Sequence, residues 1–193
     1  MRQRPIRAAL LAPFVLAALA ACASGAGTTR FTNPNFDFGF LERVAVLPFE
    51  NLTNDQQAGP RATRLMVTEL LASGAVEVVE PGEVQAALDK LGGRVQQPSK
   101  EQVQALAAAL GVQGLVVGSV TQSEVLRSGS VGVPVVSLDV HLIETETGTA
   151  VWAASHTEKG GGLGARVLGT GGQPIAETTR ACVRRALATL VKG

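Results

Sequence analysis

The side chains best suited to nucleophilic or metal chemistry are two cysteines, Cys22 and Cys182, and two histidines, His141 and His156. His141 follows Asp139 by two residues in an alternating segment, so both side chains should point to the same face of a strand. Together with His156 they could form a three-ligand metal site of the kind that zinc uses. Polar side chains on a strand face are more often simply solvated, and we therefore expect no metal site.

Patterns typical of catalysis are weak in the rest of the chain. Gly160, Gly162 and Ala165 match a relaxed dinucleotide-binding fingerprint, but that motif requires a helix directly after the glycines, and the next predicted helix starts later. Glu144 and Glu146 flank a turn, where we expect ordinary surface charge. No serine has a convincing pair of histidine and acid partners. These patterns predict a protein that is not an enzyme and has no cofactor and no small-molecule substrate.

The first 22 residues have the pattern of a bacterial export signal. Three arginines lie within the first seven residues, and the apolar run 8–21 is interrupted only by Pro13. Fourteen residues are too few for a permanent membrane helix, which needs about 20. The sequence Leu19-Ala20-Ala21-Cys22 resembles the lipobox of bacterial lipoproteins, which implies cleavage before Cys22 and acylation of that cysteine. The alternative is an ordinary signal peptide with a chance cysteine near its cleavage site.

The residues after Cys22 indicate the membrane to which the protein is sorted, and the net charge of the chain argues against nucleic acid as a partner. Ala23 and Ser24 follow, and the absence of Asp there implies, by the same resemblance, sorting to the periplasmic face of the outer membrane. Removing residues 1–21 with their three arginines changes the formal net charge from +1 to −2. Without a basic surplus the chain has no bulk electrostatic attraction to nucleic acid. Cys182 is then the only free thiol, and we expect it in the core.

Phenylalanine is concentrated just before the predicted domain. Residues 22–40 should comprise the acylated cysteine, a Gly-, Thr- and Asn-rich tether and an arm with four phenylalanines: Phe31, Phe36, Phe38 and Phe40. Because the last three alternate, we expect a short extended segment with one apolar face. An exposed aromatic strip beside a membrane would be a liability, so the arm should pack on its own domain or on another subunit. The arm is therefore a candidate interaction segment.

Residues 41–193 have the pattern of one α/β (α+β) domain. Periodicity and turn signals predict strand 43–49, helix 60–74, strand 75–79, helix 81–92, helix 99–111, strands 115–126, 133–145 and 149–157, and helix 173–192. Ser99 and Gln102 form a capping box at the start of the third helix. The order β-α-β-α-α-β-β-β-α predicts a single mixed sheet with helices packed on it.

Three stretches of this domain resemble one protein family. They are VAVLPF at 44–49, ALGVQGLVVGSV at 109–120 and VHLIETETGTAVW at 140–152. Together they resemble the CsgG family of curli-secretion lipoproteins, the related outer-membrane lipoproteins that activate peptidoglycan synthases, and the amino-terminal domain of TolB. The resemblance covers about residues 41–192. Its motifs are structural, so they indicate a fold more strongly than a function.

The resemblance implies several functions. In the curli channel each subunit of a ring adds two long hairpins to a transmembrane barrel. The corresponding segments here, 122–135 and 157–174, are too polar, and the second is too rich in glycine, to form a lipid-facing band. We expect a non-enzymatic outer-membrane lipoprotein that binds a protein partner or itself in envelope biogenesis or secretion. One alternative is a subunit of a secretion pore. The other is an activator of a peptidoglycan synthase, but the short tether argues against an activator because such a protein must reach across much of the periplasm.

Overall fold

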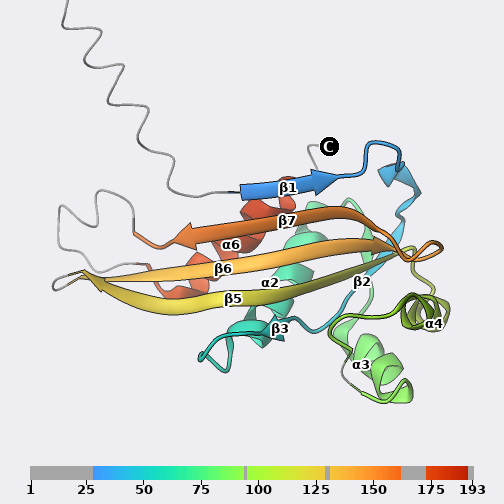
Figure 1. The fold of residues 1–193 in the computed structure, drawn as a ribbon, viewed down its shortest axis with the longest axis horizontal. Coiled ribbons are helices and arrows are strands. Elements are labelled where there is room, and N and C mark those ends of the chain that lie inside the picture. The colour runs from blue at the N-terminus through green and yellow to red at the C-terminus, as the bar shows by residue number, and fades with distance from the viewer. Residues whose placement is uncertain (1–27, 94, 129–130, 162–172, 191–193) are drawn as a thin grey trace, which may run out of the picture.

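The computed structural model describes residues 28–93, 95–128, 131–161 and 173–190. The predicted signal peptide, Cys22 and the start of the tether lie outside these residues, as do Gly162 and Ala165 of the fingerprint match. The described chain forms one mixed seven-stranded sheet with helices packed on it (Figure 1), so the predicted fold class is confirmed.

The sheet combines a parallel part with an antiparallel meander. Its strands are β1 (Thr28–Thr32), β2 (Arg43–Val46), β3 (Glu50–Asn51), β4 (Glu77–Val78), β5 (Gly114–Ser128), β6 (Val131–Glu144) and β7 (Ala150–Lys159). The helices are the 3-10 turn η2 (Phe38–Phe40), α2 (Ala58–Ser73), α3 (Pro81–Lys90), α4 (Lys100–Leu110) and α6 (Ile175–Leu187). The strand order is β1-β7-β6-β5-β2-β4, with β3 also paired to β5. Strand β2 is parallel to β4 and β5, whereas β5, β6, β7 and β1 alternate in direction.

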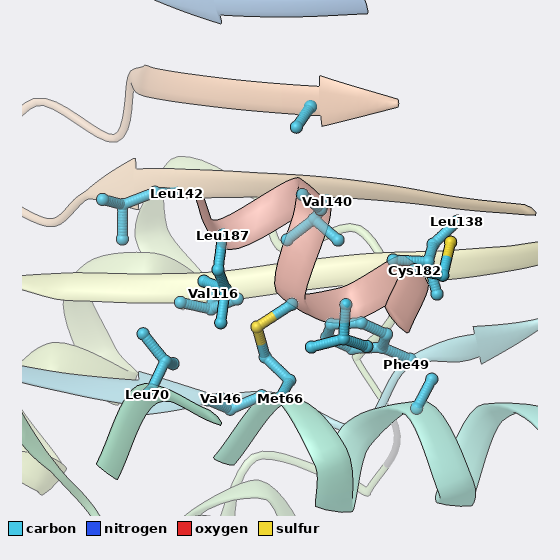
Figure 2. Packing of buried hydrophobic residues seen from close by; sticks show 14 of the residues in the cluster. Val46, Phe49, Met66, Leu70, Val116, Leu138, Val140, Leu142, Cys182 and Leu187 are labelled. Atoms are coloured by element: carbon cyan, nitrogen blue, oxygen red, sulfur yellow. The ribbon is translucent and has the colours of Figure 1, made fainter. Parts of the chain in front are cut away.

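Helices cover the two faces of the sheet unequally. On one face α2 and α6 enclose the larger apolar cluster, part of which Figure 2 shows, and Met66, Leu138 and Trp152 lie in it with no exposed surface. On the other face α3 packs against β2 and α4 against β5, around a smaller cluster. The rest of this second face, over β6 and β7, is left open and carries polar residues such as Asp139 and Ser155. Cys182 is fully buried in the larger cluster, which confirms the expected burial of its thiol.

Two expectations about the arm are wrong. Thr28–Thr32, within the predicted tether and arm of residues 22–40, forms β1, an edge strand that pairs antiparallel with β7 from Thr28↔His156 to Thr32↔Trp152. The β-branched threonines favour this pairing. The alternating phenylalanines do not form an extended segment, because η2 begins where the Asp37 side chain accepts a hydrogen bond from the Gly39 backbone.

Local signals located most helix ends, but α6 ends at Leu187 and not at the expected residue 192. Ser99 and Gln102 make both hydrogen bonds of the predicted capping box. Gly74 and Gly111 end α2 and α4 in the left-handed conformation that glycine adopts without strain. Helix α2 begins at Ala58, slightly before the expected start at Pro60.

Candidate functional site

The three residues of the hypothetical metal site project from opposite faces of the sheet. His156 pairs with Leu138 of the larger cluster and is only 2% exposed. His141 and Asp139 lie on the open face instead. Within the described ranges, no group of three His, Cys, Asp or Glu side chains is placed to hold a metal ion. These three residues therefore cannot form one site.

His156 instead connects β1, β7 and α6. Its Nδ1 atom lies 2.5 Å from the Thr28 hydroxyl, and its Nε2 atom lies 3.1 Å from Oε2 of Glu158. Arg185 forms an ion pair with the same Glu158 oxygen at 3.0 Å, and the Cys182 thiol donates to the His156 backbone oxygen at 3.3 Å. Burial, aided by the Glu158 charge, raises the pKa of Cys182 to about 12. These reactive side chain types therefore hold the edge of the sheet against α6.

Glu144 is not the surface charge that its position beside a turn suggested. Its buried carboxylate accepts hydrogen bonds from the backbone N–H groups of Glu146 and Thr147 and from the Thr147 hydroxyl. Burial alone would raise the pKa of Glu144, but these hydrogen bonds outweigh it and hold the pKa below the usual 4.5. Glu144 stabilises the β6–β7 turn, and its three-residue spacing from Thr147 is a local signal that could have revealed this role.

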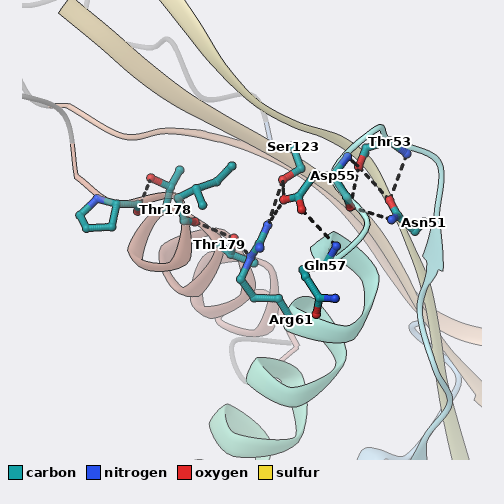
Figure 3. Close-up of polar contacts among 10 residues, drawn as sticks. Asn51, Thr53, Asp55, Gln57, Arg61, Ser123, Thr178 and Thr179 are labelled. Carbon is teal, nitrogen blue, oxygen red and sulfur yellow. Dashed lines mark hydrogen bonds and ion pairs between the residues drawn. The ribbon is translucent and has the colours of Figure 1, made fainter.

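A second polar cluster, drawn in Figure 3, joins the loop before α2 to β5 and α6. Asp55 forms an ion pair with Arg61 at 2.5 Å and accepts the Ser123 hydroxyl at 2.9 Å. Arg61 also donates to Ser123 at 3.0 Å and to Thr179 at 3.2 Å. Burial acts to raise the pKa of Asp55, but the bonds from Arg61 and Ser123 outweigh it and lower the pKa from its usual 3.8. Because its members satisfy one another, this cluster has a structural role.

An apolar cavity lies where the arm meets the ends of α2 and α6, and we call it the arm groove. Its volume is about 480 Å³. Its apolar lining comes from three separate segments of the chain, which are the arm, the region around the end of α2 and the end of α6: Phe38, Leu41, Leu70, Val76, Leu187 and Leu190. The sequence predicted the arm but not the groove, because α2 and α6 are more than a hundred residues apart.

The four phenylalanines of the candidate interaction arm have different environments. The rings of Phe36 and Phe38 meet edge to face, with centroids 5.0 Å apart, and both pack partly buried against the larger cluster. Phe40, between two groove-lining residues in the sequence, is 49% exposed, and Phe31 is 50% exposed on β1. The arm therefore packs on its own domain through two rings and presents the other two to solvent.

Charged side chains flank the arm groove. Glu69 of α2 accepts a hydrogen bond from Arg184 of α6 at 2.8 Å and lies 3.9 Å from Arg180. Glu69 and Arg184 both contribute to the wall of the groove. An apolar centre with a charged rim is the usual composition of a protein-binding surface. The groove is suited to receive an apolar side chain of another protein, and the rim can orient it.

Comparison with models of known protein families finds one family that matches this chain. The family model described as "Peptidoglycan-synthase activator LpoB" matches residues 31–157, about two thirds of the chain. The matched region begins within β1 and ends within β7, so it includes β2 to β6 in full but not α6. No protein with a curated description matches the chain.

The fold is similar to several solved structures. A PelC dodecamer from Paraburkholderia phytofirmans superposes with a TM-score of 0.58 at 18% identity, over 86% of this chain and 96% of that chain. Lipoprotein GNA1162 from Neisseria meningitidis gives 0.55 at 15% identity, over 77% and 99%. At such identities the likeness establishes a common fold alone.

Proposed function

Because the chain belongs to the LpoB family of peptidoglycan-synthase activators, we propose that it is a regulatory lipoprotein that stimulates such a synthase by direct contact. The family match is the observation that carries this proposal. The family model that matches is that of the synthase activators and not that of the CsgG family, and it gives no support to a pore-forming subunit. An activator works by binding, which is in keeping with the absence of a catalytic motif among the residues considered above.

The arm groove is the surface that we propose for the synthase. Its lining and rim combine apolar contact area with paired charges, as recognition surfaces do. Phe40 adds an exposed aromatic ring beside it, and aromatic residues often dominate binding energy. The expected contact is therefore an apolar segment of the synthase that inserts between α2, α6 and the arm.

The proposed anchor at Cys22 limits how far the domain reaches. Docking of β1 shortens the tether, since the domain begins at Thr28 and not near residue 41. The six-residue step from Cys22 to Thr28 spans at most about 21 Å when fully extended. The activated synthase must therefore extend a periplasmic segment close to the outer membrane.

The decisive experiment is an activity assay with a purified bifunctional synthase of the same bacterium. Adding the lipoprotein should increase the rate of glycan polymerisation or cross-linking, measured by chromatography of the released muropeptides. Phe40→Ala and Phe38→Ala should weaken this effect, whereas Leu52→Ala, which alters an exposed residue away from the groove, should leave it intact. A synthase that neither binds nor responds to the wild-type protein would contradict the proposed function.

Acylation is tested separately. Cys22→Ala, or treatment with globomycin, should abolish the lipid mass increment and release the protein from the outer-membrane fraction. If the mature protein carries no lipid and stays soluble, the anchoring proposal is wrong.

Self-association is a second candidate property. The PelC protein of similar fold is a dodecamer, and β1 leaves one side of its backbone unpaired within the described part of the sheet. An exposed strand edge can pair with another copy. Light scattering of the detergent-solubilised lipoprotein distinguishes a monomer, which would dismiss this property, from a larger assembly.

A further inference from the structure

The β5–β6 hairpin carries exposed aliphatic side chains at its described end. Val125 is 55% exposed and Leu126 is 45% exposed, and Arg127 beside them is also exposed. Leu126 pairs with Val133 near the tip of the hairpin. Aliphatic residues at the end of a projecting hairpin lower solubility unless something covers them.

This end of the hairpin lies on the anchored side of the molecule. Thr28, the first residue of β1, pairs with His156, which in turn pairs with Leu138 of β6. The hairpin continues from this level towards its turn, and Figure 1 shows it extending past the start of β1. Val133 lies five positions before Leu138 on β6, so the overhang is about 17 Å.

The overhang and the tether have matching lengths. The chain from Cys22 to Thr28 reaches at most about 21 Å. A domain held this closely, with a hairpin that projects about 17 Å beyond the attachment point, brings the hairpin end to the lipid surface when the sheet points along the tether. Arg127 and Lys159 add positive charge suited to lipid phosphates at this end of the sheet, where Glu124 is also exposed.

We propose that Val125 and Leu126 dock into the headgroup region of the membrane that holds the lipid anchor, as a surface contact that fixes the orientation of the domain. The inference rests on the proposed anchoring at Cys22. The other end of the sheet, where β5 begins and α2 ends, would then face away from the membrane. The arm groove lies at that far end, since its lining includes the residues that follow α2. Docking would thus present the groove to a partner in the periplasm.

Site-specific fluorescence tests this contact in the intact lipoprotein. Leu126→Cys receives a nitrobenzoxadiazole label, while acylated Cys22 and buried Cys182 remain unlabelled. Leu71→Cys is the matched control, because Leu71 is 55% exposed and lies near the far end of α2. The protein is reconstituted into vesicles of phosphatidylethanolamine and phosphatidylglycerol, and quenching is measured with iodide in the water and with spin-labelled lipid in the bilayer.

The expected result is a several-fold loss of iodide quenching and strong lipid quenching at position 126, with the opposite at position 71. Val125→Glu should reduce the lipid quenching at 126, because a carboxylate is repelled by the anionic vesicle. Equal iodide access at the two positions would overturn the proposal. Protection of position 126 from iodide without lipid quenching, if it increases with the density of protein on the vesicles, would also overturn it, because a second copy of the chain would then cover the residue.

Flotation of the same vesicles separates this inference from its premise. Protein that floats but shows no lipid quenching keeps its anchor and contradicts only the docking. Protein that fails to float lacks the anchor, which removes the basis of the docking as well. The synthase assay is independent of both readouts.

Discussion

His156, Glu144 and Asp55 are of residue types that often do chemistry, yet each is used here to hold elements together. Each accepts or shares hydrogen bonds with groups from neighbouring segments. A buried or half-buried ionisable group is tolerated only when partners replace the water it has lost. Their positions in the structure therefore reflect stability.

Asp55 makes the stability of the domain sensitive to acid. Because the pKa of Asp55 is lower in the folded protein than the usual 3.8, its contribution is present above that value. The contribution is lost as the pH falls through the lower, folded pKa. Asp55→Asn removes the ion pair with Arg61 and should cost about 1–3 kcal/mol at neutral pH.

Urea titrations of both proteins between neutral pH and pH 3 check this prediction. The difference in the free energy of unfolding should shrink towards the acid end of the series. A constant difference across the series would mean that Asp55 does not titrate with folding.

Cys182 should be inert in the folded protein. Its full burial and its pKa of about 12 leave almost no exposed thiolate at pH 8. Ellman's reagent should therefore release no colour from the native lipoprotein and one equivalent after denaturation in guanidinium. Rapid reaction in the native state would show that α6 separates readily from the sheet.

At the scale of elements, local sequence signals located the helices and the long strands, but they missed β1 and the short strand β3. The capping box at Ser99 and the turn at Gly148 each depend on a few neighbouring residues. Strand β1 is short, follows a tether-like composition, and exists because Thr28 and its neighbours meet β7 more than a hundred residues later. Pairing at that distance leaves little trace in a local window.

The packing of β5 against β6 and Phe49 gives a test at this scale. A Cβ atom at Gly118 would lie 2.7 Å from the Asp139 backbone oxygen and 3.0 Å from the Phe49 ring. Gly118→Ala should therefore destabilise the domain by about 1–3 kcal/mol through overpacking. Gly82→Ala in α3, where nothing lies within 4 Å, should be neutral or stabilising.

Chemical denaturation of the two variants beside wild type measures both effects. Equal midpoints for Gly118→Ala and Gly82→Ala would contradict the close approach at Gly118.

At the scale of the whole molecule, one sheet joins the two apolar clusters. The strands β2 and β5 contribute to both, through Val46 and Val116 on one face and Ala45 and Leu115 on the other. Unfolding one cluster would expose the strand that supports the other. We therefore expect the domain to unfold as a single unit.

Trp152, the one tryptophan of the chain, reports on this cooperativity. It is fully buried, and its indole N–H donates to Thr189 at 3.1 Å. Its fluorescence should change in urea with the same midpoint as the circular dichroism of the helices, which lie on both faces. Separate midpoints would show that the α3–α4 side unfolds on its own.

None of the described helices has the length and apolar character needed to cross a bilayer.

The sequence alone determined the fold class, the order of most elements, the export pattern ending at Cys22 and the concentration of phenylalanines in one arm. These features are encoded by residues close together in the chain, through periodicity, caps and turns. Only the tertiary structure decided that His156 is buried while His141 is exposed, that β1 shortens the tether, and that the arm closes a groove between α2 and α6. Each of these features depends on which distant segments pack together. That packing is determined by the burial of apolar surface over the whole domain and not by any local stretch of sequence.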